Sequence, residues 1–189
     1  LILISIPLVV FFAISLVVAL ILLIIRLFSK KACDIASLRW VQFGLWLANK
    51  ITGMKTVAEG RENITTDEAV LYVSNHLSLF DIIVLYNLMK KPTGFIAKKE
   101  INKVPILNIL MRFTHCLFLD RSDPRNGLQM VLDAAELIKG GTSMFLFPEG
   151  TRSKDGEILD FKTGGFKIVE KTHCQAGPVR IDYAKEVFE

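Results

Sequence analysis

A histidine and an aspartate lie five positions apart in a short polar segment of this 189-residue sequence. His76 directly follows an apolar run that predicts a buried strand, and Asp81 opens a predicted helix. A tight loop would bring the carboxylate to one imidazole nitrogen and leave the other nitrogen free as a general base. The alternative is that Asp81 only caps its helix and His76 is an ordinary loop residue.

A nucleophile belonging to the protein is not marked in the sequence. It contains no Gly-x-Ser-x-Gly segment, and Ser78 lies inside the His76–Asp81 loop itself. Direct attack by a substrate group is therefore favoured over an acyl-enzyme. The three histidines and three cysteines show no zinc-site spacing, so we expect no metal, and we expect Cys33, Cys116 and Cys174 to be reduced thiols.

Two further polar clusters supply cations. Arg121 ends a predicted strand, Arg152 lies in a turn that contains glycine, and Lys98 follows a third strand. A guanidinium binds phosphate in a bidentate way, which suits a phosphorylated substrate. The alternative for each is a solvated surface charge, which we expect for Lys99, Lys103, Lys154 and Lys171. Glu149 beside Arg152 is a candidate ion-pair partner, and the segment 162–165 is either an anion site or a plain turn.

Strands alternate with helices after the N-terminal region, which predicts an α/β fold with a mostly parallel sheet flanked by helices. In such folds the chemistry lies outside the carboxyl ends of the strands, and all three polar clusters fall there. The predicted strands are 55–58, 69–74, 93–97, 116–119 and 143–147, and the predicted helices are 81–89, 106–113, 126–139 and 163–171.

The first 25 residues contain no charge and would form a helix of roughly 37 Å, enough to enter or cross a bilayer. The basic residues Arg26, Lys30 and Lys31 follow and predict that the next domain faces the cytoplasm. A signal peptide and a buried core helix both fit this stretch poorly. Because Pro7 can kink the helix, spanning and re-entrant insertion both remain open.

A second N-terminal helix is predicted over residues 35–51, with two tryptophans beside basic residues. It either lies at the bilayer interface or packs on the globular domain. We therefore predict a membrane-embedded two-helix segment over residues 1–52 and a catalytic domain over residues 53–189. All charged residues follow Ile25, and the net charge is only +4, so we expect neither a polytopic transporter nor a nucleic-acid partner.

Four ordered segments resemble the glycerolipid acyltransferase family with the His-x-x-x-x-Asp motif. NHLSLFD at 75–81 is similar to that motif, and GFIAKKE with LFLDR at 94–121 is similar to the second motif region. FPEGTRS at 147–153 and FKTGGF at 161–166 resemble the third motif and the segment after it. The family's N-terminal membrane helices match the expectation for residues 1–52, and the nearest group within the family acylates lysophosphatidic acid.

This resemblance implies a role for each candidate residue. His76 would deprotonate the sn-2 hydroxyl of lysophosphatidic acid, Asp81 would orient His76, and acyl-CoA or acyl carrier protein would donate the acyl group. No metal or bound cofactor is implied. The alternatives are another lysophospholipid or glycerol 3-phosphate as acceptor, or a non-catalytic membrane protein that binds anionic lipid. The phosphate of the acceptor would be held by Lys98, Arg121 and the turn Glu149, Gly150, Thr151 and Arg152.

One segment departs from the family pattern. Residues 171–180 lack the apolar strand that normally follows the glycine segment, and residues 178–189 look like a later strand of the family. We therefore expect a loop and a strand to be missing near Cys174 and Gln175.

Overall fold

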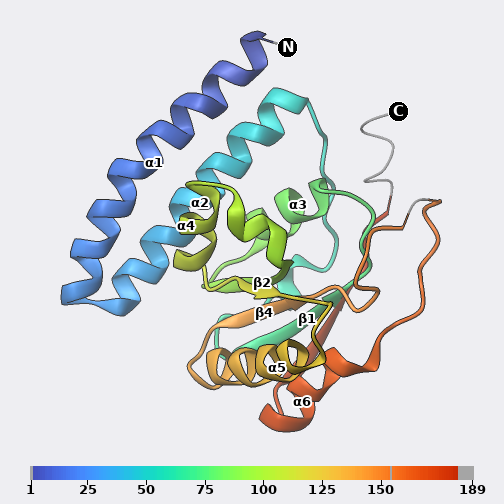
Figure 1. Ribbon diagram of the computed structural model, residues 1–189. Coiled ribbons are helices and arrows are strands. Elements are labelled where there is room, and N and C mark those ends of the chain that lie inside the picture. The colour runs from blue at the N-terminus through green and yellow to red at the C-terminus, as the bar shows by residue number, and fades with distance from the viewer. Residues whose placement is uncertain (1, 154, 183–189) are drawn as a thin grey trace.

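A five-stranded parallel sheet forms the centre of the computed structural model, which describes residues 2–153 and 155–182 (Figure 1). The strand order β3-β2-β4-β1-β5 places every carboxyl end at one edge, and helices cover both faces. The predicted α/β fold is thereby confirmed. The strands are β1 (Val70–Ser74), β2 (Thr93–Lys98), β3 (Leu117–Leu119), β4 (Ser143–Leu146) and β5 (Gln175–Val179).

The helices agree with the predictions to within a few residues, apart from the N-terminal pair. The α-helices are α1 (Ile2–Phe28), α2 (Lys30–Thr52), α3 (Phe80–Leu88), α4 (Leu107–Phe113), α5 (Pro124–Lys139) and α6 (Lys167–Thr172). Short 3-10 helices are η1 (Arg61–Asn63), η2 (Lys99–Lys103) and η3 (Thr163–Phe166). The predicted helix 163–171 is thus divided between η3 and α6.

Two strand predictions differ from the structure. The predicted strand at 55–58 is wrong, because this short polar run forms an irregular connection between α2 and η1. β5 is not among the predicted strands, and the strand-like segment expected at 178–189 meets it only at Pro178 and Val179. β5 contains Gly177 and Pro178 and pairs with β1 along its whole length. Its edge position tolerates the proline, which cannot donate to a ladder. Residues 183–189 lie outside the described residues, and a missing segment near Cys174 stays a prediction.

Each face of the sheet has its own apolar core. On one face Tyr72, Phe95 and Phe145 pack with residues of α2 and α3, including Leu38 and Leu85. The rings of Phe95 and Phe145 are stacked at 4.7 Å. On the other face, residues of α5 and α6 cover Leu71, Met144 and Leu146, and these include Val131, Ala134 and Ile168. The two cores hold the strands rigidly behind their carboxyl ends.

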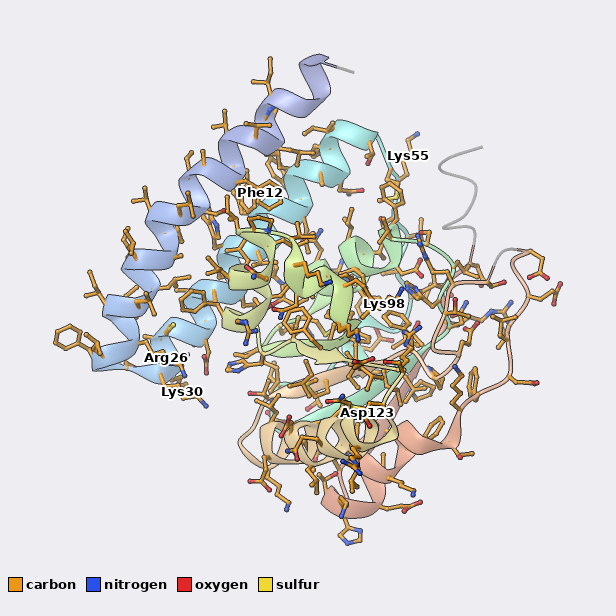
Figure 2. All side chains as sticks on the ribbon, viewed as in Figure 1. Phe12, Arg26, Lys30, Lys55, Lys98 and Asp123 are labelled. Atoms are coloured by element: carbon orange, nitrogen blue, oxygen red, sulfur yellow. The ribbon has the colours of Figure 1, made fainter. Side chains whose placement is uncertain are left out.

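Helices α1 and α2 form an antiparallel hairpin beside this domain (Figure 1). Only Ser29 separates them, and its side chain accepts a hydrogen bond from the Ala32 N–H at 3.2 Å. The hairpin is therefore tighter than predicted, and the basic residues Arg26 and Lys30 lie at its turn (Figure 2). Helix α1 continues through Pro7.

One face of α1 packs on α2, and the rest is apolar and exposed. Phe11, Ser15, Ala19 and Leu22 recur at helical spacing and are at most 8% exposed. Residues 6–28 have a mean hydropathy of 3.5, which is enough to cross a membrane by length and composition alone. The exposed apolar side chains of α1 include Val9, Val17, Leu20, Leu23, Ile24 and Leu27.

Helix α2 joins the hairpin to the domain. Leu38 is 1% exposed within the core under α3, with Val41 and Leu45 packed beside it. The Gln42 amide donates to the Tyr86 and Met89 carbonyls at 3.0 and 2.7 Å. Of the two expectations for this helix, packing on the globular domain is the one that the structure shows. The boundary between residues 52 and 53 stays a prediction.

Candidate active site

His76 and Asp81 are in direct contact at the carboxyl end of β1. His76 Nδ1 lies 2.7 Å from Asp81 Oδ2, so Nε2 is the ring nitrogen left for a substrate. The imidazole stacks on the Phe147 ring at 4.3 Å between centroids, and its side chain stays 19% exposed. A partly accessible imidazole with one nitrogen fixed by a carboxylate has the arrangement of a general base.

The Asp81 carboxylate is fully buried and is held by the loop that it closes. It accepts hydrogen bonds from the Leu77 and Ser78 N–H groups at 2.7 and 3.0 Å, in addition to the imidazole. The Ser78 hydroxyl lies 3.3 Å from Asp81 Oδ1 and accepts the Phe80 N–H. Asp81 therefore orders the loop that leads into α3 and contacts His76. It is not the N-cap of the helix, because Leu79 takes that position without a side-chain hydrogen bond.

Glu149 lies behind His76 and is 2% exposed. Its Oε1 accepts the backbone N–H of His76 at 2.9 Å, and its Oε2 accepts the Leu159 N–H at 3.2 Å. A carboxylate used in this way positions the loop that carries His76. Within the described part of the chain, Glu149 makes no ion pair with Arg152, so the structure does not bring these two together.

The turn after β4 crosses directly to the histidine loop. The Ser153 N–H donates to the His76 carbonyl at 2.8 Å. Gly150 has a φ of 70°, a left-handed conformation that favours glycine, and a Cβ at this position would lie 3.0 Å from Lys162 Nζ. The Lys162 N–H donates to the Pro148 carbonyl at 2.9 Å. Lys162 thus adds a cation beside the turn. From the sequence, segment 162–165 was expected to bind an anion only through its backbone N–H groups, if at all.

The predicted cationic residues share this edge of the sheet but stand at different distances from His76. Thr151 and Arg152 lie on the adjacent strand's turn and are exposed. Lys98 is the last residue of β2, roughly 10 Å across the sheet from β1, and Arg121 follows β3, roughly 14 Å away. Lys98 lies 3.7 Å from Glu100, and no ion pair is formed by Arg121 or Arg152 with any described residue.

A second ion pair at this edge was not anticipated. Lys99 donates to Asp120, which also accepts the Ser122 N–H and hydroxyl at 2.9 and 2.6 Å. The Lys99 hydrogen bond, with help from Ser122, lowers the pKa of Asp120 to about 2 and raises the pKa of Lys99. This pair joins the ends of β2 and β3. The sequence favours a solvated charge at Lys99, so this ion pair could be predicted only once β2 and β3 were known to be neighbours.

Metal ligands are not gathered at this edge. Across residues 2–153 and 155–182, no group of three His, Cys, Asp or Glu side chains is placed to hold an ion. Cys33, Cys116 and Cys174 are unpaired thiols.

Comparison with known proteins gives a consistent family. Residues 55–182 match the family model described as Acyltransferase. A chloroplast 1-acyl-sn-glycerol-3-phosphate acyltransferase of Arabidopsis thaliana is 41% identical over 65% of this chain and 35% of its own length. The 1-acyl-sn-glycerol-3-phosphate acyltransferase of Borreliella burgdorferi is 28% identical over 78% of this chain and 58% of its own. The chain thus spans between about a third and three fifths of these relatives.

A solved structure resembles the whole arrangement. The crystal structure of PlsC, the 1-acyl-sn-glycerophosphate acyltransferase of Thermotoga maritima, superposes with a TM-score of 0.68 at 28% sequence identity. The match covers 91% of this chain and 72% of that chain.

Proposed function

This chain belongs to the acyltransferase family, and we propose that it transfers a fatty acyl group to the sn-2 hydroxyl of lysophosphatidic acid. The observation that carries the proposal is the His76–Asp81 pair, which leaves one imidazole nitrogen free at an edge rich in cations. The relatives named above are acyltransferases for this acceptor, which supports the same substrate here.

The acyl transfer proceeds by direct attack of the acceptor. Nε2 of His76 takes the proton of the sn-2 hydroxyl as its oxygen attacks the thioester carbonyl. Asp81 holds the imidazole in the required tautomer and stabilises the imidazolium that forms. The tetrahedral intermediate collapses, the carbon–sulfur bond breaks, and the thiolate leaving group receives the proton from His76. The products are phosphatidic acid and the free thiol.

The phosphate of lysophosphatidic acid is bound by the cations at the same edge. Arg152 stands nearest to His76, on the turn that hydrogen-bonds its carbonyl, and Lys98 lies further along the sheet. Their charges fix the acceptor so that its hydroxyl meets Nε2. Arg121 supplies a third positive charge at the outer strand. No resident cofactor takes part in this scheme.

The acyl donor is acyl-CoA or acyl carrier protein, both of which present a thioester. The developing oxyanion needs preorganised donors. Backbone N–H groups at the start of η3 are candidates, although the Lys162 N–H is already bonded to Pro148.

We place the protein at the cytoplasmic face of a membrane. Helix α1 packs along α2, and the opposite face of α2 is buried against the domain. A bilayer crossed perpendicularly by α1 would also have to contain α2 and the domain beside it. The arrangement therefore supports a re-entrant or surface-embedded α1, with its exposed apolar face in one leaflet.

The acceptor is tested with a panel of lysophospholipids and the full-length protein in detergent. We expect phosphatidic acid from lysophosphatidic acid with at least one of the two donors, at a rate well above that for lysophosphatidylcholine or glycerol 3-phosphate. A higher rate with either of those acceptors would move the assignment to it. A folded protein that acylates nothing would favour the non-catalytic lipid-binding alternative.

A further inference from the structure

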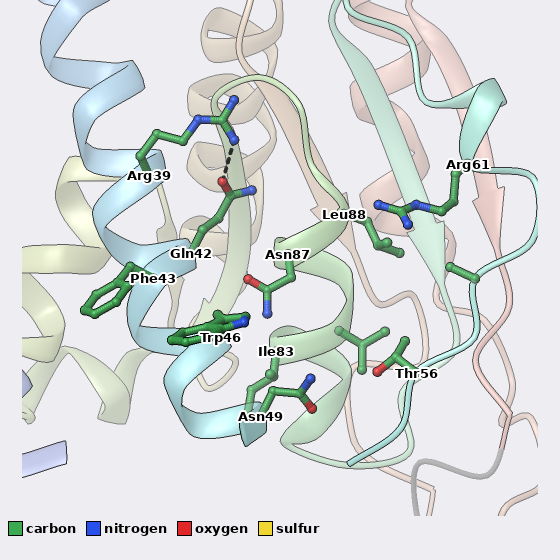
Figure 3. A pocket seen from close by; sticks show the side chains of 12 residues that line it. Arg39, Gln42, Phe43, Trp46, Asn49, Thr56, Arg61, Ile83, Asn87 and Leu88 are labelled. Atoms are coloured by element: carbon green, nitrogen blue, oxygen red, sulfur yellow. Dashed lines mark hydrogen bonds between the residues drawn. The ribbon is translucent and has the colours of Figure 1, made fainter. Parts of the chain in front are cut away.

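A cleft lies on the hairpin side of the domain, between α2, α3 and the connection that leads to η1 (Figure 3). Its volume is about 460 Å³, and neither His76 nor Asp81 lines it. Helix α3 contributes residues on its outer side, away from the buried Asp81 and Leu85. Four of the residues that line it are used below: Arg39, Phe43, Trp46 and Arg61.

Two guanidinium groups enter the cleft from opposite walls (Figure 3). Arg39 donates to the Gln42 side-chain oxygen at 2.8 Å, while the amide of Gln42 is held by backbone carbonyls of α3 and its C-cap. Neither Arg39 nor Arg61 pairs with a carboxylate in the described part of the chain. Two unneutralised guanidiniums facing one cavity suit a phosphate group.

A row of aromatic rings connects this cleft to the apolar helix. Phe11 of α1 stacks on Trp40 at 5.0 Å, Trp40 lies 5.8 Å from Phe43, and Phe43 stacks on Trp46 at 5.9 Å. Phe43 and Trp46 are 47% and 49% exposed and form one wall of the cleft. Tryptophan is enriched where protein crosses from hydrocarbon to headgroups. A phospholipid bound here would thus have its phosphate beside the arginines and its acyl chains beside the aromatic rings that lead to α1.

We propose that this cleft binds an anionic glycerophospholipid of the surrounding membrane. Its phosphate lies between Arg39 and Arg61, and its acyl chains run along Phe43 and Trp46 toward α1. This lipid is not consumed, and its site is separate from that of the reacting acceptor.

The test uses phosphatidylglycerol with brominated acyl chains, which quenches nearby tryptophans. Full-length protein in a zwitterionic detergent is titrated with this lipid, with brominated phosphatidylcholine and with inorganic phosphate. We expect saturable quenching that is lost in Trp46→Phe. We also expect a midpoint about tenfold lower for phosphatidylglycerol than for phosphatidylcholine, because only the former carries a net negative charge, which the two guanidinium groups would neutralise.

The decisive variant is Arg39→Gln with Arg61→Gln. Its midpoint should rise by about tenfold, while Lys139→Gln with Lys171→Gln, the same charge change on α5 and α6, should leave it unchanged. If the double variant does not fold, Arg61→Gln alone is used, because this side chain is exposed and forms no ion pair with a described residue.

Three results would contradict the proposal that this cleft binds an anionic phospholipid. They are equal quenching by both lipids, a midpoint unaffected by the arginine changes, and displacement of the lipid by inorganic phosphate, which would identify free phosphate as the ligand. Acyl transfer in detergent is measured in parallel, and the arginine substitutions should leave it unchanged. Absence of transfer in the unsubstituted protein would contradict the proposed function, whereas the quenching titration would still test this lipid site.

Discussion

Two buried carboxylates hold His76 from different directions. Asp81 fixes its ring through Nδ1, and Glu149 fixes its backbone N–H. The first contact sets which nitrogen is free, and the second sets where the loop stands relative to the turn after β4. The proposed function needs both contacts, because a general base must lie within hydrogen-bond reach of the proton that it removes.

Glu149→Ala is expected to lower kcat more than it raises KM for lysophosphatidic acid. The change leaves the His76 and Leu159 N–H groups without their acceptor and should destabilise the fold by about 1–3 kcal/mol. Glu149→Gln retains one acceptor oxygen and should recover part of kcat and of stability. Steady-state kinetics with thermal unfolding in detergent measure both. A pure rise in KM would instead indicate direct contact with the phosphate.

Acid should release the Asp120–Lys99 pair in a defined range. Because the folded pKa of Asp120 is about 2 and the unfolded value is about 4, the pair stabilises the fold above pH 4. That contribution is lost as the pH falls from about 4 to about 2. Carboxyl NMR titration should show Asp120 protonating near 2 and, in Lys99→Met, closer to 4. An unchanged value in the variant would show that Lys99 is not the cause.

The sequence was sufficient for contacts that are local in the chain. His76 and Asp81 are five positions apart, so a loop between a strand and a helix brings them together by itself. Glu149 and His76 are 73 positions apart and meet only because β1 and β4 are neighbours. Strand order is set by the packing of both helical layers, and no local pattern contains it.

At the scale of elements, the hairpin depends on a close approach between α1 and α2. The Phe11 ring lies over Gly44, and a Cβ at that position would come within 2.3 Å of the ring. Beside it, Trp40 Nε1 donates to the Ser15 hydroxyl at 2.9 Å. These contacts explain how a helix as apolar as α1 has a single orientation on the domain.

Gly44→Ala should therefore separate the two helices. The ring cannot remain where it is, so we expect a lower thermal unfolding temperature in detergent and faster proteolysis at the Ser29 turn. Phe11→Leu removes the clash, and the double variant should regain much of the loss relative to Gly44→Ala. Additive losses in the double variant would contradict the proposed packing.

The elements themselves were largely predictable, with instructive exceptions. Periodicity located every α-helix, and apolar runs located four of the five strands. β5 was missed because Gly177 and Pro178 are poor strand formers, and the sheet accepts them only at its edge beside Tyr72. The segment 55–58 was expected to be a strand because a short run carries too little pattern to distinguish a strand from a coil.

On the scale of the whole molecule, α1 presents one apolar surface, on the side that does not contact α2. The outer side of α1 is almost wholly exposed and apolar, while α2 is committed to the domain. The composition of the sequence was enough to locate this surface. The orientation of α1 relative to the domain required the structure, because the sequence left both spanning and re-entrant insertion open.

Both ends of α1 should lie on the same side of the membrane. In inverted membrane vesicles, Ile6→Cys and Leu27→Cys should react with an impermeant maleimide from the same side as Lys139→Cys on α5, in a background with the three native cysteines replaced by serine. Both should react more slowly than Lys139→Cys, because the exposed face of α1 lies in the leaflet, but at rates similar to each other. A helix that spans the bilayer would protect Ile6→Cys until the vesicles are permeabilised.

The central claim is that His76 is the base in acyl transfer. It is tested most directly by the rate of phosphatidic acid formation from lysophosphatidic acid and an acyl thioester in His76→Ala. The account predicts that kcat falls by about 10²–10⁴ while the thermal stability and KM of the acceptor stay close to those of the unsubstituted protein. A variant that keeps its rate to within a few-fold would contradict it, since no other described group stands where Nε2 does.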